Sequence, residues 1–166
     1  ITSLLNSTMS DSSPKSTQSS NTPTEFEEDG VFVALTHDTL DAASIMNKVR
    51  SPKAGAIVLF AVHLAYEAYA PLAIKTMAKI ARQIKDKHGL NGVAMIHRLG
   101  VVPIAEESIL IAVSSPHRQA AWRAGEEALE LTKEKVEVWK LEEFGGEEGG
   151  VWRANRDGQA GVKISN

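Results

Sequence analysis

The 166-residue chain contains no cysteine, which excludes disulfide bonds, thiolate metal centres and a cysteine nucleophile. It also lacks any apolar run of about 18 residues, so we expect no membrane-spanning helix. Neither sign of charge dominates, because 18 basic and 21 acidic side chains give a net charge of −3. A protein that binds nucleic acid non-specifically needs a strong basic excess, and we therefore expect no nucleic-acid binding. The absence of disulfides predicts the cytosol as the compartment.

Several well-known functional motifs are missing as well. The sequence has no phosphate-binding loop, no dinucleotide-binding glycine fingerprint and no H-E-x-x-H zinc motif. Its five histidines share no spacing typical of metal ligands. We therefore expect neither a metal nor a cofactor in this protein.

The N-terminal region differs in composition from the rest. The first 24 residues include 13 serines or threonines and few apolar residues, too few to offset the entropy lost on ordering. An acidic group follows at Glu25, Glu27, Glu28 and Asp29. We predict a disordered tail over residues 1–29 and one folded domain over 30–166. The tail carries a charge of −4, which leaves the domain close to neutral at +1.

Hydrophobic periodicity predicts an α+β fold in which helices pack on a largely antiparallel sheet. The stretch 109–113 is apolar throughout and predicts a central strand that is buried on both faces. Ser115-Pro116 matches a helix start, with a capping serine followed by proline at the first helical position. We predict strands at 31–36, 93–99, 108–114, 136–139 and 151–156, and helices over 41–49, over 71–88 and from residue 115 onward.

One segment does not fit this pattern. Residues 55–69 have strand-like character over fifteen positions, without proline, asparagine or aspartate after Gly55. Strands average about 5–6 residues. The segment must therefore be two strands or one long bent strand, although no turn residues separate two halves.

Two groups of cations are candidates for a binding or catalytic site. His117 and Arg118 lie at the predicted helix start, where free N–H groups and the helix dipole favour an anion. An ordinary helix start with an exposed His-Arg pair is an equal alternative. Lys133 and Lys140 lie seven residues apart across the passage from helix to strand.

Two lysines that converge on one cleft lower each other's pKa, which makes a nucleophile or proton donor near neutral pH. Two lysines whose ammonium groups reach solvent are an equal alternative at this point. Arg153 and Arg156 follow near the C-terminus and could close such a cleft.

Seven stretches in order resemble one family, the large catalytic subunit of molybdopterin synthase of eukaryotic, fungal type. The resemblance covers about residues 30–157, most of the predicted domain. The stretches are Gly55–Phe60, Tyr66–Pro71, Ile96–Pro103, Ser114–Trp122, Lys133–Lys140, Glu142–Phe144 and Val151–Arg156.

The resemblance implies a sulfurtransferase of molybdenum cofactor biosynthesis. In that family, sulfur from the thiocarboxylated C-terminal glycine of a small ubiquitin-like subunit is transferred to a cyclic pyranopterin monophosphate, forming the dithiolene of molybdopterin. The large subunits form a homodimer with one small subunit at each end, a heterotetramer. By motif position, Lys133 and Lys140 are the catalytic candidates, with Lys133 favoured. The substrate-binding candidates are His117, Arg118, Lys133, Lys140, Leu141, Glu142 and Arg156.

The chain departs from the family after Ala61. The family usually has a Gly-Thr-Thr-Arg-like turn and a polar loop there, whereas Ala61 continues directly into Val62. Roughly a dozen residues are missing, including an arginine of the pterin site. The missing loop explains the overlong segment, which we interpret as two strands joined without their loop. The gap is either a gene-model omission or a true loss.

Two functions therefore remain open. The first is an active sulfurtransferase subunit, favoured by the two lysines. The second is a non-catalytic interaction protein of the same fold, favoured by the missing loop. A sensing module of α+β type is a third reading, but such a module needs no paired lysines near a His-Arg helix start.

Overall fold

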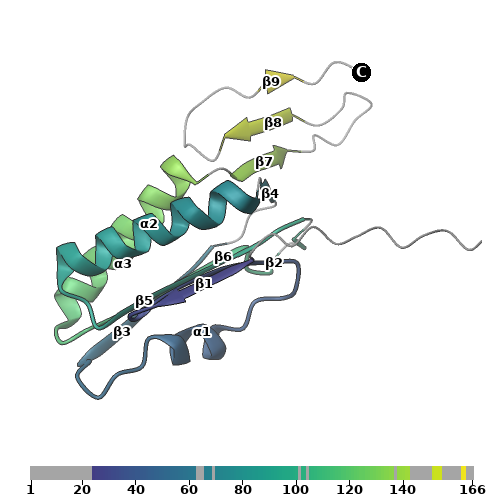
Figure 1. The fold of residues 1–166 in the computed structure, drawn as a ribbon. Helices are drawn as coiled ribbons and strands as arrows, with labels where there is room; N and C mark the ends of the chain where they lie inside the picture. The colour runs from purple at the N-terminus through teal and green to yellow at the C-terminus, as the bar shows by residue number, and fades with distance from the viewer. Residues whose placement is uncertain are drawn as a thin grey trace, which may run out of the picture.

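The described part of the chain forms two β-sheets and three helices (Figure 1). The computed structural model describes residues 24–62, 66–68, 70–100, 102–103, 105–136, 138–142, 151–154 and 162–163, with side chains over 24–62, 72–100, 102–103 and 105–136. The main sheet has the order β1-β2-β5-β6-β3 and the second sheet the order β4-β7-β8-β9. The main-sheet strands are β1 (Glu25–Glu28), β2 (Val31–Thr36), β3 (Ala56–Val62), β5 (Gly92–Arg98) and β6 (Ile109–Ser115). The second sheet contains β4 (Tyr66–Ala68), β7 (Val138–Glu142), β8 (Val151–Ala154) and β9 (Val162–Lys163), and the helices are α1 (Ala42–Lys48), α2 (Ala70–His88) and α3 (Arg118–Lys135).

The strand pairing confirms the α+β prediction with a largely antiparallel sheet. Only β2 and β5 run parallel in the main sheet, and its other three pairs are antiparallel. The overlong apolar segment is two strands, because β3 pairs with β6 in the main sheet while β4 pairs with β7 in the second. The two strands do not form a hairpin, and only residues 63–65 lie between them.

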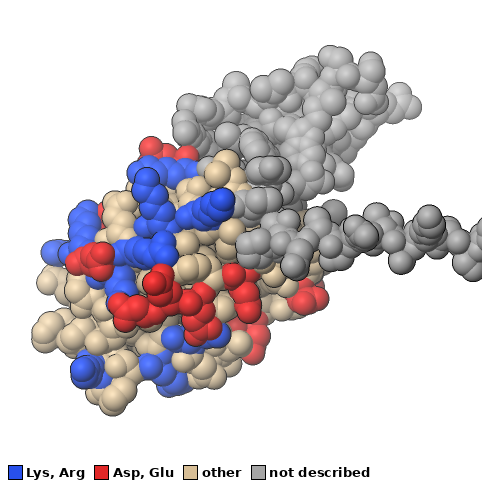
Figure 2. All heavy atoms as spheres, viewed as in Figure 1, with Lys and Arg blue, Asp and Glu red and all other residues tan. Residues whose placement is uncertain are grey.

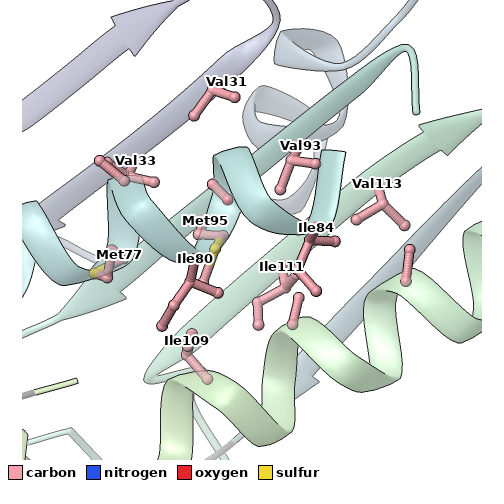
Figure 3. Close-up of a cluster of buried hydrophobic side chains, with 14 of the residues drawn as sticks. Val31, Val33, Met77, Ile80, Ile84, Val93, Met95, Ile109, Ile111 and Val113 are labelled. Carbon is pink, nitrogen blue, oxygen red and sulfur yellow. The ribbon is translucent and has the colours of Figure 1, made fainter. Parts of the chain in front are cut away.

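The hydrophobic core lies on both faces of the main sheet. Helices α2 and α3 cover one face, and the short helix α1 lies on the other (Figure 1). Every residue of β6 is buried, which confirms the predicted central strand. Figure 3 shows Met77, Ile80 and Ile84 of α2 directed at the strands. The strand residues that surround them are Val31, Val33, Val93, Met95, Ile109, Ile111 and Val113.

The helices α1 and α2 confirm their predicted bounds to within one residue. Asp41 caps α1, because its Oδ1 accepts from the N–H of Ala43 at 2.9 Å. Gly89 follows the last residue of α2 with φ +61°, a conformation that glycine adopts without strain. The start of α1 and the end of α2 therefore follow from local sequence chemistry.

The boundary predicted at residue 29 is wrong, because β1 forms an edge strand of the main sheet. Its acidic side chains pair with cations far along the chain: Glu27 with Lys48 at 2.7 Å and Glu28 with Arg82 at 2.7 Å. Asp29, just after the strand, reaches Lys85 at 3.1 Å. Figure 2 shows acidic side chains in a band across this face with basic ones on both sides. These contacts hold a segment that composition alone assigns to the tail.

The predicted start of α3 is also wrong by two to three residues. Ser115 is the last residue of β6, paired with Ala56, so it cannot cap the helix. His117 occupies the N-cap position and makes no side-chain capping hydrogen bond. Ser115 Oγ instead accepts from the N–H of His117 at 3.3 Å. Sheet pairing therefore overrides the local Ser-Pro signal.

Candidate active site

Helix α3 carries one group of the predicted site residues at each end. His117 precedes its first residue, Arg118, and both side chains are exposed. The loop before β3 packs against this end, because the N–H of Gly55 donates to Ser115 O at 2.9 Å. A Cβ on Gly55 would lie 2.4 Å from Pro116 O, so only glycine fits this contact. A cavity of about 550 Å³ lies beside it, lined by residues 50–52 and 54–57.

The other end of α3 carries Lys133. Its side chain is 24% exposed, and its Nζ lies 3.7 Å from Glu130 Oε1 one turn earlier. The preceding residue Thr132 is buried, and its hydroxyl donates to Ala128 O at 2.7 Å. Lys133 is thus a partly buried cation on a helix turn that the core holds in place. Sequence reasoning did not identify Glu130, although its i, i+3 spacing from Lys133 is the signal that could have found it.

The second lysine lies in the second sheet. Lys140, Leu141 and Glu142 belong to β7, the strand between β4 and β8. The register places Lys140 opposite Tyr66 of β4 and Arg153 of β8. Two residues separate the end of α3 from β7, so Lys133 and Lys140 flank the passage from the helix into this sheet. Arg156 lies outside the described residues.

The structure does not bring the two cationic groups together within one chain. Lys133 follows Arg118 by fifteen residue steps along the helix, which corresponds to about 22 Å along the axis. A small substrate cannot span that distance. The expectation that the paired lysines lie near the His-Arg helix start is therefore wrong for a single copy.

The stretch Ile96–Pro103 contributes to the family resemblance but to none of the predicted site residues, and it contains a buried histidine beside a half-buried arginine. His97 is fully buried in β5, where its Nδ1–H donates to Arg98 O at 2.9 Å. Burial lowers the pKa of His97 to about 4, only partly opposed by this hydrogen bond. Arg98 forms an ion pair with Glu106. Among the described residues, no group of three or more histidines and acids is placed to hold a metal ion.

None of the three described helices has the length and apolar character needed to cross a bilayer.

Comparison with known proteins identifies the relatives of this fold. A sequence model of the MoaE protein family matches residues 35–135. A Neurospora crassa protein named molybdopterin synthase catalytic subunit is 67% identical over 154 aligned positions, covering 86% of this chain and 75% of that protein. The chain also resembles a crystal structure of molybdopterin synthase from Staphylococcus aureus, with 34% identity and a TM-score of 0.66. That match covers 72% of this chain and 94% of the other.

A third match shows the fold alone. The complex of subunits 1 and 2 of molybdopterin-converting factor from Helicobacter pylori matches with 21% identity and a TM-score of 0.57, over 66% of this chain and 82% of that chain.

The Neurospora crassa alignment also shows a difference in length. The 86% of this chain that it covers is about 143 of 166 residues, whereas the alignment has 154 positions. About eleven positions therefore have no residue in this chain. This number agrees with the roughly dozen residues that the family resemblance predicts to be missing after Ala61.

Proposed function

This chain belongs to the MoaE family, and from that premise we propose that it is the catalytic subunit of a molybdopterin synthase. Its substrate is a cyclic pyranopterin monophosphate, and its product carries the molybdopterin dithiolene. Sulfur comes from the C-terminal thiocarboxylate of a small ubiquitin-like partner. The identity to a named catalytic subunit supports the activity. The absence of cysteine fits it too, because a chain without thiols cannot itself carry sulfur as a persulfide.

The observation that carries the proposal is the position of Lys133 beside the passage into β7. Its partly buried ammonium group can donate a proton to an oxygen that leaves as sulfur enters. Lys140, on an inner strand of the second sheet, is the second cation at this end. A dithiolene contains two sulfurs, so two thiocarboxylates are consumed and each becomes a carboxylate. Leu141, Glu142 and Arg156 complete the proposed substrate-binding set.

The proposed site takes its anion-binding His117 and Arg118 from a second copy of the chain. Their separation from Lys133 by about 22 Å supports this arrangement, since one copy cannot place both groups on one substrate. The proposed assembly is a homodimer of large subunits with a small subunit at each end, in the cytosol.

Mixed dimers test this arrangement. Arg118→Ala and Lys133→Ala should each be inactive alone. In an equal mixture, half of the dimers contain one copy of each variant. Each of these mixed dimers has two sites, of which one combines the intact Lys133 of one copy with the intact Arg118 of the other. The mixture should therefore recover about a quarter of wild-type activity. No recovery after subunit exchange would refute a site shared between copies.

Turnover tests the function itself. Purified chain is mixed with the thiocarboxylated partner and the pterin precursor, and dithiolene formation is measured. Lys133→Ala should abolish product while leaving partner binding unchanged. Lys135→Ala is the matched control, because this exposed lysine lies two residues further in the same helix turn. Equal loss in both variants would refute a specific role for Lys133.

A specific observation favours a second candidate, a non-catalytic protein of the same fold. Only three residues join β3 to β4, and the arginine expected in that loop is missing. Inactivity of this chain, with activity after a family-type loop is inserted between Ala61 and Val62, would establish the second candidate. Activity without the loop would exclude it.

A further inference from the structure

A row of cations on helix α2 is only partly neutralised. Lys75, Lys79 and Arg82 follow one another at steps of four and three residues, which places them along one face of the helix. All three residues are exposed. Arg82 pairs with Glu28 of β1 at 2.7 Å. Within the described ranges Lys75 and Lys79 form no ion pair, so the row lacks counter-charge at the end nearer the start of α2.

Strand β1 lies beside this row of cations (Figure 2). Asp29, just after the strand, meets Lys85 at 3.1 Å. Three residues earlier, the centroid of the Phe26 ring lies 4.5 Å from Cζ of Arg82. Moving back along the strand therefore moves towards the start of α2. The next position in this direction is Thr24, which precedes β1.

The alternation of side chains along the strand places Thr24 on the face that meets α2. Phe26 contacts α2, whereas its neighbour Glu27 pairs with Lys48 of α1 on the opposite face. Thr24 is two residues before Phe26 and shares its face. Its carbonyl oxygen accepts from the N–H of Leu35 at 2.7 Å, which continues the pairing with β2. Thr24 is exposed, so its hydroxyl can be modified.

The spacing brings Thr24 to the unpaired lysines. Two strand residues span about 7 Å, which equals about four to five residues of helix. Counted back from Arg82, this distance ends between Lys75 and Lys79. The hydroxyl of Thr24 therefore lies within reach of two flexible cationic side chains.

The sequence after Thr24 is typical of the substrate of an acid-directed kinase. Such a kinase reads acidic residues with a complementary basic groove. The side chains of the acids that form ion pairs remain at least 60% exposed, so a kinase can reach them. Thr8, by comparison, has a single acid within five residues after it, Asp11. The acids that follow Thr24, at the first, third, fourth and fifth positions, are Glu25, Glu27, Glu28 and Asp29.

We propose that Thr24 is a phosphorylation site and that its phosphate binds Lys75 and Lys79. The Thr24 hydroxyl oxygen attacks the γ-phosphorus of a nucleoside triphosphate. The bond from that phosphorus to the β-phosphate oxygen breaks, the diphosphate leaves, and the hydroxyl proton passes to the kinase. The new group carries a charge of about −1.5 to −2 at pH 7. It extends the ion pairs of β1 along α2 and holds the edge strand more firmly. The proposal does not depend on the proposed function.

Phosphorylation of the full chain tests the site. The chain is incubated with a purified acid-directed serine/threonine kinase and ATP, and the modified positions are identified over time by tandem mass spectrometry. Thr24 should be modified before Thr8, and Thr24→Ala should remove the phosphate of that position alone. Absence of phosphate at Thr24, or modification of Thr8 at the same rate or faster, would overturn the proposal.

Hydrogen exchange of the β1 amides tests the contact with the lysines. Phosphorylation should slow exchange over residues 25–28 by about two- to fivefold, the range that exposed ion pairs give. Salt at about 1 M should remove the effect. The double variant Lys75→Ala/Lys79→Ala should abolish the slowing. Lys53→Ala is the matched control, because it removes an exposed lysine of the loop before β3 and should keep the slowing.

Circular dichroism melting verifies that the lysine variants fold. No slowing in the phosphorylated wild type, or equal slowing in the wild type and the double variant, would overturn the contact between phosphate and lysines. Dithiolene formation is not a readout in either experiment, so failure of this proposal and failure of the proposed function are distinguishable.

Discussion

The buried histidine of β5 predicts a specific loss of stability in mild acid. His97 has a pKa near 6.5 when unfolded, and burial lowers the pKa to about 4 in the folded protein. Between these two values the unfolded chain binds a proton that the folded chain does not. The free energy of unfolding therefore falls as the pH falls from about 6.5 to about 4. The full difference corresponds to about 3 kcal/mol, of which about 2 kcal/mol is already lost at pH 5.

Urea unfolding at pH 7.5 and pH 5, at one protein concentration, measures this loss. In His97→Asn the side-chain amide can still donate to Arg98 O but cannot take up a proton. This variant should lose about 2 kcal/mol less than the wild type between the two pH values. His37→Asn is the control, because it removes an exposed histidine of the same chain. Equal losses in wild type and His97→Asn would refute the reasoning.

Three further predictions concern stability. Gly125→Ala should destabilise the protein by about 1–3 kcal/mol in urea melts, because the new Cβ would lie 2.5 Å from Phe60 Cε2; an equal loss in a Phe60→Leu background would contradict this. Asp41→Ala should lower the free energy of unfolding by about 1 kcal/mol through the lost cap of α1; an unchanged thermal midpoint would contradict it. The hydrogen bond from Lys87 lowers the pKa of Glu127, so wild type should exceed Glu127→Gln in stability at neutral pH. That advantage should disappear as the pH falls through the lowered pKa of Glu127, and its persistence in acid would contradict the assignment.

The elements that could be predicted are those whose structure depends on local pattern. The apolar run at 109–113 predicted a central strand, and β6 is buried along its whole length. The buried stripe of α2, which includes Met77 and Ile84, follows directly from its spacing of three and four residues. The caps of α1 and α2 likewise follow from Asp41 and Gly89.

The elements that could not be predicted depend on pairing between distant segments. Ser115 looks like a helix cap but is held in β6 by Ala56, about sixty residues earlier in the chain. The acids of β1 look like part of a solvated tail, although Arg82 and Lys85 of α2 bind two of the acids at its end. The separate second sheet depends on β4 and β7, whose sequences carry no sign that they pair.

The same contrast applies to the candidate site. Motif resemblance identified Arg118 and Lys133 as residues of one pocket, because sequence order carries no distance. Only the length of α3 shows that they lie about 22 Å apart in one copy. The role of each residue remains a prediction, whereas their separation is a property of the fold.

The short connection between β3 and β4 has a consequence for how the chain length can vary. Because it joins two different sheets, residues can be added or removed there without shifting the register of either one. Lengthening it from three residues to about fifteen would add only about 1.4 kcal/mol of closure entropy. The two sheets should therefore tolerate a long loop and a short one alike. Removal of the loop between β3 and β4 can therefore abolish activity without preventing folding, and a protein that lacks this loop can remain a stable subunit.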